Sequence, residues 1–176
     1  MLGLRSAAAA DPAGGAAGAP MLSGKRVFVV DGGETEVVVS DVYPKCGMIV
    51  ADAGAAPAQE REYDAARCLF RVRVQRDQEG WARLEFTPVV QYGQELLRPV
   101  ARDSEWEMVA QRREDRFYPQ RFEVLLNIGD MCLITGRTDR HGTPGYRFFL
   151  GPDGHDDLQR LFLVRLVHIG RAAAAK

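Results

Sequence analysis

Three histidines, His141, His155 and His168, are the residues best suited to metal or acid–base chemistry. No HxH, HxxE or HExxH spacing joins them, so a metal site would have to be assembled entirely by the fold. The best local cluster is His155-Asp156-Asp157, which follows a glycine turn. A metal site and an ordinary solvated loop both fit this cluster, and we predict the solvated loop and no metal ligand.

The serines and the glycine-rich segments give no catalytic pattern. Ser23, Ser40 and Ser104 lack a GxSxG context, and no cysteine has a histidine placed as an evident base. Residues 129–138 (GDMCLITGRT) resemble a phosphate loop only superficially, because the spacing is wrong and Arg137 stands where the motif needs lysine. We therefore predict a protein that is not an enzyme, with no catalytic and no cofactor-binding residues.

The cysteines give no sign of a disulfide framework. Cys46, Cys68 and Cys132 are odd in number and lack CxxC spacing. Cys68 and Cys132 lie within apolar segments, where cysteine behaves as a small hydrophobic residue. The prediction is buried free thiols.

Four arginines share one face of two predicted strands: Arg67, Arg71, Arg73 and Arg83. An arginine-bearing sheet can contact phosphates, but sheets that read nucleic acids also display aromatic residues for base stacking. Here Trp81 alone is a candidate for such stacking, and Glu85 on the partner strand offers neutralisation. We expect an ordinary charged face, with nucleic-acid binding as an alternative.

Composition narrows the class of protein. The chain has 176 residues, 46% of them apolar, which suits one domain with a real core. Lysine plus arginine total 23 against 24 acidic residues, so bulk positive charge cannot drive binding to nucleic acid or membranes. The sequence has no run of about 18 apolar residues and no visible signal peptide. Residues 1–20 are predicted as a disordered Ala/Gly/Pro tail, 21–170 as a single β-domain and 171–176 as a short tail.

Alternation of apolar and polar residues predicts strands along most of the domain. The clearest are residues 66–75 and their hairpin partner 81–90. Others are residues 25–30 and 36–42 around a glycine turn, 46–50, 104–110 (where a helix is the alternative), 121–126 and 131–136 as a hairpin, 146–150 and 159–169. Residues 51–59 and 137–145 are predicted as loops. The fold class is therefore all-β, as an antiparallel β-sandwich or rolled sheet.

Three segments in order resemble a family. Residues 121–136 (RFEVLLNIGDMCLITG), a following loop and residues 159–169 (QRLFLVRLVHI) are similar to the C-terminal core of bacterial type II and type III secretion secretins. Gly129 matches the turn glycine of that core, Gly136 the first glycine after it, and residues 161–169 its closing strand. The similarity extends over residues 67–169 to small uncharacterised secretin-like bacterial proteins.

The resemblance implies a secretin-like β-domain that lacks the membrane hairpin, because residues 100–120 show no alternating amphipathic hairpin. It implies a non-enzymatic structural or protein-interaction module of the cell envelope or secretion apparatus, with a protein partner or a homo-oligomer. Without the resemblance, the cytoplasm is the expected compartment. The alternatives are a nucleic-acid-binding β-domain and, less favoured, a metal-dependent β-fold enzyme near His155 and Asp157.

Overall fold

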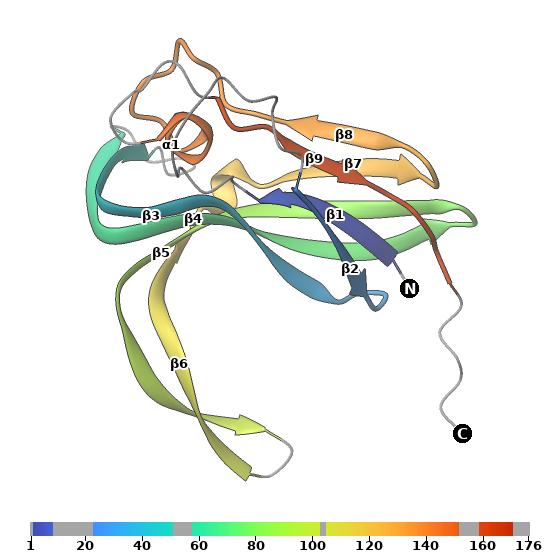
Figure 1. Ribbon diagram of the computed structural model, residues 1–176, viewed down its shortest axis with the longest axis horizontal. Coiled ribbons are helices and arrows are strands. Elements are labelled where there is room, and N and C mark those ends of the chain that lie inside the picture. The colour runs from blue at the N-terminus through green and yellow to red at the C-terminus, as the bar shows by residue number, and fades with distance from the viewer. Residues whose placement is uncertain (1, 9–22, 51–57, 103–104, 152–158, 171–176) are drawn as a thin grey trace.

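The computed structural model describes residues 2–8, 23–50, 58–102, 105–151 and 159–170, and most of them lie in β-strands (Figure 1). In chain order the elements are β1 (Leu2–Ala8), β2 (Ser23–Val29), β3 (Glu34–Val50), β4 (Gln59–Gln78), β5 (Trp81–Arg102), β6 (Glu105–Arg116), the 3-10 helix η1 (Tyr118–Gln120), β7 (Phe122–Asn127), β8 (Met131–Ile134), α1 (Pro144–Leu150) and β9 (Phe162–Arg165). The predicted all-β class is confirmed.

Strand β5 is the central strand of a five-stranded antiparallel sheet ordered β3-β4-β5-β6, with β7 also paired to β5. One edge of β5 pairs with β4. Its other edge pairs first with β7, over residues 81–86, and then with β6, from Val89 to Arg102. The first part of β5 therefore lies between β4 and β7, and its last part pairs with β6.

The predicted strands at residues 66–75 and 81–90 are confirmed within β4 and β5. Their alternation places one set of side chains in the core, and Val72, Val74, Leu84 and Phe86 have no exposed surface. The polar loop between the strands ends at Gly80, whose φ of +79° is a conformation that glycine adopts at little cost.

A second layer covers one face of this sheet. It consists of the β8–β9 pair and helix α1 (Figure 1). Phe70 on β4 packs against this layer through Phe148, Phe149 and Phe162, and its ring also lies near Phe86 and Phe122 of the large sheet. The five ring centroids lie between 5.3 and 6.2 Å from that of Phe70. Edge-to-face and stacked pairs of this kind add to the free energy from buried area.

The segment of residues 121–136 was expected to be a hairpin, and that expectation is wrong. Both strands and the turn exist, but β7 pairs with β5, whereas β8 pairs with β9. The turn amides serve other elements, since Gly129 N donates to Leu166 O at 2.7 Å and Leu166 N donates to Asp130 O at 3.1 Å. The turn therefore connects two sheets.

The expected hairpin of residues 25–30 and 36–42 is also wrong. Strand β2 pairs with β1, and β3 pairs with β4. The glycine turn between β2 and β3 docks on β4 instead: Gly32 N donates to Val74 O, and Val74 N donates to Gly33 O. Strand β1 lies inside the region expected to be a disordered tail, while residues 9–20 of that region lie outside the described residues.

Residues 146–150 form part of helix α1 where a strand was expected. Thr143 is the N-cap, accepting a hydrogen bond from Tyr146 N at its Oγ1, and Pro144 occupies the first turn. Both are residue types that favour a helix start. Gly136 lies against this helix: a β-carbon there would overlap the carbonyl oxygen of Gly145, so only glycine allows this approach.

The predicted strand at residues 159–169 is shorter than expected. Only Phe162–Arg165 forms β9, in a two-stranded sheet with β8. Strand β9 is itself part of the second layer, and Phe162, Val164 and Leu166 are buried. Most of the loop expected at residues 51–59 lies outside the described residues, and Gln59 already begins β4.

Candidate interaction surface: the β5–β6 arm

The distal halves of β5 and β6 leave the body of the protein as a two-stranded hairpin (Figure 1). We call residues 93–102 and 105–112 the arm. The pairing of β4 with β5 ends at Gln91, so beyond that point β5 pairs only with β6 among the described strands. A bulge between Tyr92 and Leu96, with Gly93 at φ +73°, marks where the arm departs. Bulges bend the strand that carries them.

One face of the arm is apolar over its outer part, beyond the Arg112–Glu95 ion pair. Residues directly opposite each other in an antiparallel ladder share a face, and successive residues alternate between faces. Three opposed pairs make up what we call the apolar face: Leu97 with Ala110, Pro99 with Met108, and Ala101 with Trp106. Its large side chains are open to solvent, with Trp106 75%, Leu97 66% and Met108 58% exposed.

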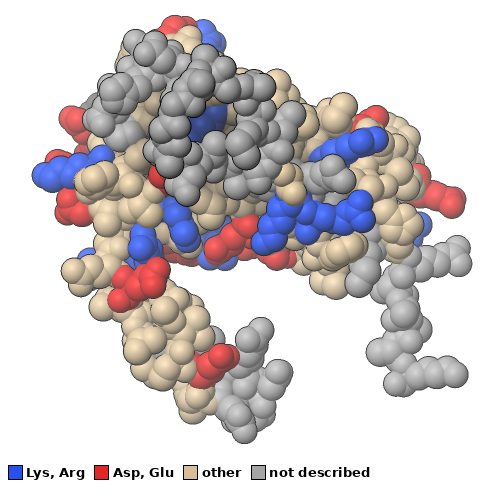
Figure 2. Space-filling view, viewed as in Figure 1, with Lys and Arg blue, Asp and Glu red and all other residues tan. Residues whose placement is uncertain are grey.

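The opposite face of the arm is mixed. It carries the pair Leu96 and Gln111, together with Glu107 and Val109. In the space-filling view the arm is largely uncharged with a few acidic side chains, whereas the body displays a mixed band of basic and acidic residues (Figure 2). The arm is therefore an amphipathic hairpin.

Two expectations meet here. The prediction of a strand over residues 104–110, with Trp106, Met108 and Ala110 on one side, is confirmed by β6. The expectation that residues 100–120 lack an amphipathic hairpin is wrong, because β6 pairs with the end of β5 in the register given above. Sequence reasoning missed the β5 half because its apolar residues change to the opposite face of the strand beyond the bulge, and because Pro99 is uncommon inside a strand.

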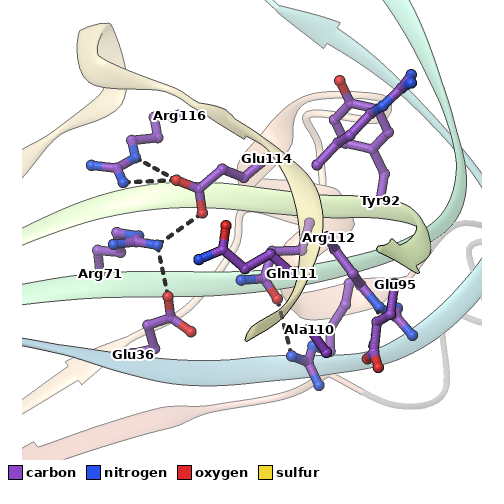
Figure 3. A pocket seen from close by; sticks show the side chains of 12 residues that line it. Glu36, Arg71, Tyr92, Glu95, Ala110, Gln111, Arg112, Glu114 and Arg116 are labelled. Atoms are coloured by element: carbon purple, nitrogen blue, oxygen red, sulfur yellow. Dashed lines mark hydrogen bonds and ion pairs between the residues drawn. The ribbon is translucent and has the colours of Figure 1, made fainter. Parts of the chain in front are cut away.

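Glu114, at the base of the arm, joins β6 to the sheet (Figure 3). Its Oε1 accepts hydrogen bonds from Arg116 Nε at 2.9 Å and Nη2 at 2.7 Å, and its Oε2 accepts from Arg71 Nη2 at 2.8 Å. Burial alone would raise the pKa of Glu114, but Arg116 and Arg71 outweigh it and hold that pKa below its ordinary value. Arg71 also pairs with Glu34 and Glu36.

Asp115 makes a second connection at the base. Tyr63 Oη on β4 donates to Asp115 Oδ2 at 2.9 Å, and Arg61 lies 3.6 Å from the same carboxylate. The rings of Tyr63 and Tyr92 are 5.1 Å apart. Burial, together with the hydrogen bond to Asp115, raises the pKa of Tyr63 above its ordinary range, so the phenol remains a donor. These contacts fix the direction of the arm.

A polar groove of about 840 Å³ lies at this junction. Besides the glutamates and Arg71, its walls include Arg67, Tyr92 and Arg112. Arg67 donates to Gln91 at 3.0 Å, and Arg112 pairs with Glu95 at 3.3 Å. The Nε groups of Arg67 and Arg71 are buried and meet no acceptor among the described residues. Most of the charged side chains that line the groove therefore take part in ion pairs with one another.

Two of the four arginines of the predicted face, Arg71 and Arg83, pair with carboxylates, and Arg67 donates to Gln91. Arg71 lines the groove, while Arg83 pairs with Asp77 at 3.0 Å and with Glu123 at 3.3 Å. Glu85, expected to neutralise this face, lies 3.4 Å from Arg121, the residue just before β7. Trp81, the expected exposed aromatic residue, is half-buried, and the highly exposed tryptophan is Trp106.

The remaining candidates do not converge. His155, Asp156 and Asp157 lie outside the described residues, and the part of the chain that the structure describes holds no group of three metal-ligating side chains. The ring of His141 packs on Tyr146 at 4.7 Å. Cys46 and Cys68 are buried, whereas Cys132 is partly exposed.

A second cavity, of about 360 Å³, lies between the large sheet and α1. Phe70, Phe122, Phe148 and Phe149 line it, so it is mainly apolar. The hydroxyl of Thr143 at its edge already donates to Arg140 O and accepts from Tyr146 N. The wall of the cavity is therefore mainly apolar, and the Thr143 hydroxyl at its edge already makes the hydrogen bonds that cap α1.

Comparison with known proteins found no family model, no curated protein and no solved structure that matches the chain. Among the described residues, no helix has the length and apolar character needed to cross a membrane.

Proposed function

We propose that this protein is a non-enzymatic, self-associating structural module that uses the β5–β6 arm as its interaction element. The apolar face of the arm carries this proposal. Leu97, Trp106 and Met108 project into solvent on a hairpin that stands away from the body. Contiguous exposed apolar surface of this kind marks interaction sites in soluble proteins.

The edges of the arm add a second means of association. Beyond Gln91, β5 has no β4 partner, and no described strand pairs with the outer edge of β6. Such edges present unpaired N–H and C=O groups that another chain can extend. Association through the arm therefore includes edge pairing and docking of its apolar face as two physical routes.

The ion-pair network at the base supports this role. Glu114 is held by Arg71 and Arg116, and Asp115 by Tyr63, so β6 is tied to β4 through side chains. An arm held in one direction loses less conformational entropy on binding than a free one. The secretin-like resemblance adds the setting that we propose, a component of the cell envelope or secretion apparatus.

Nucleic-acid binding by the arginine face has less support. Arg71 would have to exchange three glutamate partners for phosphates, and Arg83 two carboxylates. Absence of binding to single-stranded and double-stranded DNA and RNA at low salt would remove this alternative, because low salt favours such contacts most.

The test of the proposed function is a variant with a shortened arm. Leu96 and Gln111 are directly opposite, so residues 97–110 can be replaced by Asn-Gly, which forms a two-residue hairpin turn. The contacts of Glu114 and Asp115 remain in this variant. Light scattering should show association of the full chain that the shortened chain lacks. A full chain that stays monomeric, or a shortened chain that associates equally, would refute the proposal.

A further inference from the structure

We infer that two copies of this chain pair by stacking the apolar faces of their arms, and that the assembly closes at two. This inference rests on the proposed function, which leaves open whether the edges or the face of the arm make the contact. Three observations favour the face and a second copy: the order of large and small residues, the area available and the use of a single face.

Large and small residues alternate on the face in a self-complementary order. Along β5 the face runs from Leu97 through Pro99 to Ala101, and along β6 from Trp106 through Met108 to Ala110. Each strand thus has its large residue at one end and its alanine at the other. Packed layers interdigitate when large residues face small ones.

A two-fold axis through the Pro99–Met108 pair achieves this match. If the axis runs across the strands, Trp106 stacks over Ala110 of the second copy and Leu97 over its Ala101. If the axis runs along the strands, Trp106 stacks over Ala101 of the second copy and Leu97 over its Ala110. Both arrangements follow from the observed register, and in both every large end residue meets an alanine.

The area is sufficient for a specific dimer. A tryptophan offers on the order of 200 Å², and Trp106, Leu97 and Met108 are more than half exposed. With Pro99, Ala101 and Ala110, each face offers about 500–600 Å², so two faces bury about 1,000–1,200 Å², at the lower end of specific interfaces. This size fits a dimer of moderate affinity.

Face stacking and edge pairing predict different stoichiometries. An arm has one apolar face, so two copies satisfy each other and the contact is closed and isologous. It has two outer edges, so edge pairing leaves one edge open on each copy and permits further growth. A mass of two chains, independent of rising concentration once reached, belongs to face stacking.

Two neighbouring leucines provide a matched pair of variants. Leu97 lies on the apolar face and Leu96 on the opposite face, and both are exposed. Leu97→Glu and Leu96→Glu make the same chemical change one residue apart. Sedimentation velocity should show that Leu97→Glu weakens dimerisation about thirtyfold or more, as for an interface hot spot, while Leu96→Glu stays within about threefold of wild type.

Ala110→Trp separates stacking from general stickiness. The substitution adds apolar surface, so non-specific association would strengthen. In the stacked dimer it places a second large residue where a small one is needed, so dimerisation should weaken about tenfold or more, as for loss of interface complementarity. Circular dichroism and thermal unfolding of each variant establish that the arm and body remain folded.

The outcomes distinguish face stacking from the more general proposal that the protein associates through its arm. Dimers that are lost in Leu97→Glu and in Ala110→Trp but kept in Leu96→Glu support face stacking. Equal association of all three variants, or growth beyond two chains, overturns face stacking, and the shortened arm then tells whether the proposed function survives. A wild-type chain that is monomeric at all concentrations overturns both.

Discussion

Replacing Glu114 by glutamine tests the network that positions the arm. The change removes the negative charge between Arg116 and Arg71 while keeping the size of the side chain. Glu114 accepts three charge-assisted hydrogen bonds, two from Arg116 and one from Arg71. The three side chains are only 21% to 34% exposed, so solvent screens them less than a typical surface pair.

The expected loss follows from these contacts. Hydrogen bonds to charged groups contribute about 1.5–3 kcal/mol each when buried, and fully exposed ion pairs about 0–1 kcal/mol. Because this site is intermediate and glutamine retains one acceptor, we expect the free energy of unfolding to fall by about 2 kcal/mol. For a chain of this length that corresponds to a melting temperature lower by about 4–8 °C.

The effect should depend on pH. The pKa of Glu114 is lowered in the folded protein, so its contribution is complete above the unfolded value of about 4.3. It disappears as the pH falls through the folded pKa, because the carboxylate is then protonated in both states. Thermal unfolding from neutral pH to about pH 3 should therefore show the gap between wild type and Glu114→Gln closing in acid.

Glu123→Gln is the matched control. Glu123 lies 3.3 Å from Arg83, and both side chains are 46% exposed. The same substitution there should lower the free energy of unfolding far less than Glu114→Gln does, because solvent screens this exposed pair. A Glu114→Gln variant no less stable than Glu123→Gln, or a gap that persists unchanged at low pH, would refute the argument that the base of the arm is held by charge.

Three further predictions concern the core, the helix contact and the thiols. Phe70→Ala should lower the free energy of unfolding by about 3–5 kcal/mol in denaturant titrations, because the ring is buried among five others. Gly136→Ala should destabilise the protein because its β-carbon would overlap Gly145, whereas Gly145→Ala should be nearly neutral in the same titrations, since its β-carbon meets no atom within 4 Å. Thiol labelling of the native protein should modify Cys132 before Cys68, which is buried and whose pKa is raised by its contact with Cys46 and by burial.

Local sequence patterns predicted the long strands well. The alternation in residues 66–75 and 81–90 requires a strand because every second residue there is apolar and ends in the core. The glycine at position 80 correctly marked their turn. These features depend only on neighbours in the sequence.

Pairing between distant strands was beyond such patterns. Nothing near residues 121–136 indicates that β8 will pair with β9, because that choice depends on Leu166 reaching the turn. In the same way, Tyr146 and Phe149 look like strand residues until Thr143 and Pro144 are recognised as a helix start. Burial by the second layer decides such cases more than local propensity does.

The arm shows most clearly what the sequence contains and conceals. The alternation of Trp106, Met108 and Ala110 was visible, but the matching residues Leu97 and Pro99 are out of phase with the rest of β5. The bulge at Gly93 adds two residues to β5 and so keeps its alternation, which means that the apolar positions pass from the core-facing side of β5 to the opposite side in the arm. The apolar face of the arm can therefore be recognised only from the pairing register of β5 and β6.

Fluorescence of Trp106 reports whether the apolar faces of two arms meet in solution. In a Trp81→Phe background, Trp106 is the only tryptophan of the chain, so its emission reports the environment of the apolar face alone. As the concentration rises from about 1 µM to about 200 µM, across the range expected for a moderate interface, we expect the emission of Trp106 to move to shorter wavelengths and its quenching by acrylamide to decrease. If Trp106 keeps the emission wavelength of a solvent-exposed tryptophan and is quenched equally at every concentration, the apolar faces do not stack.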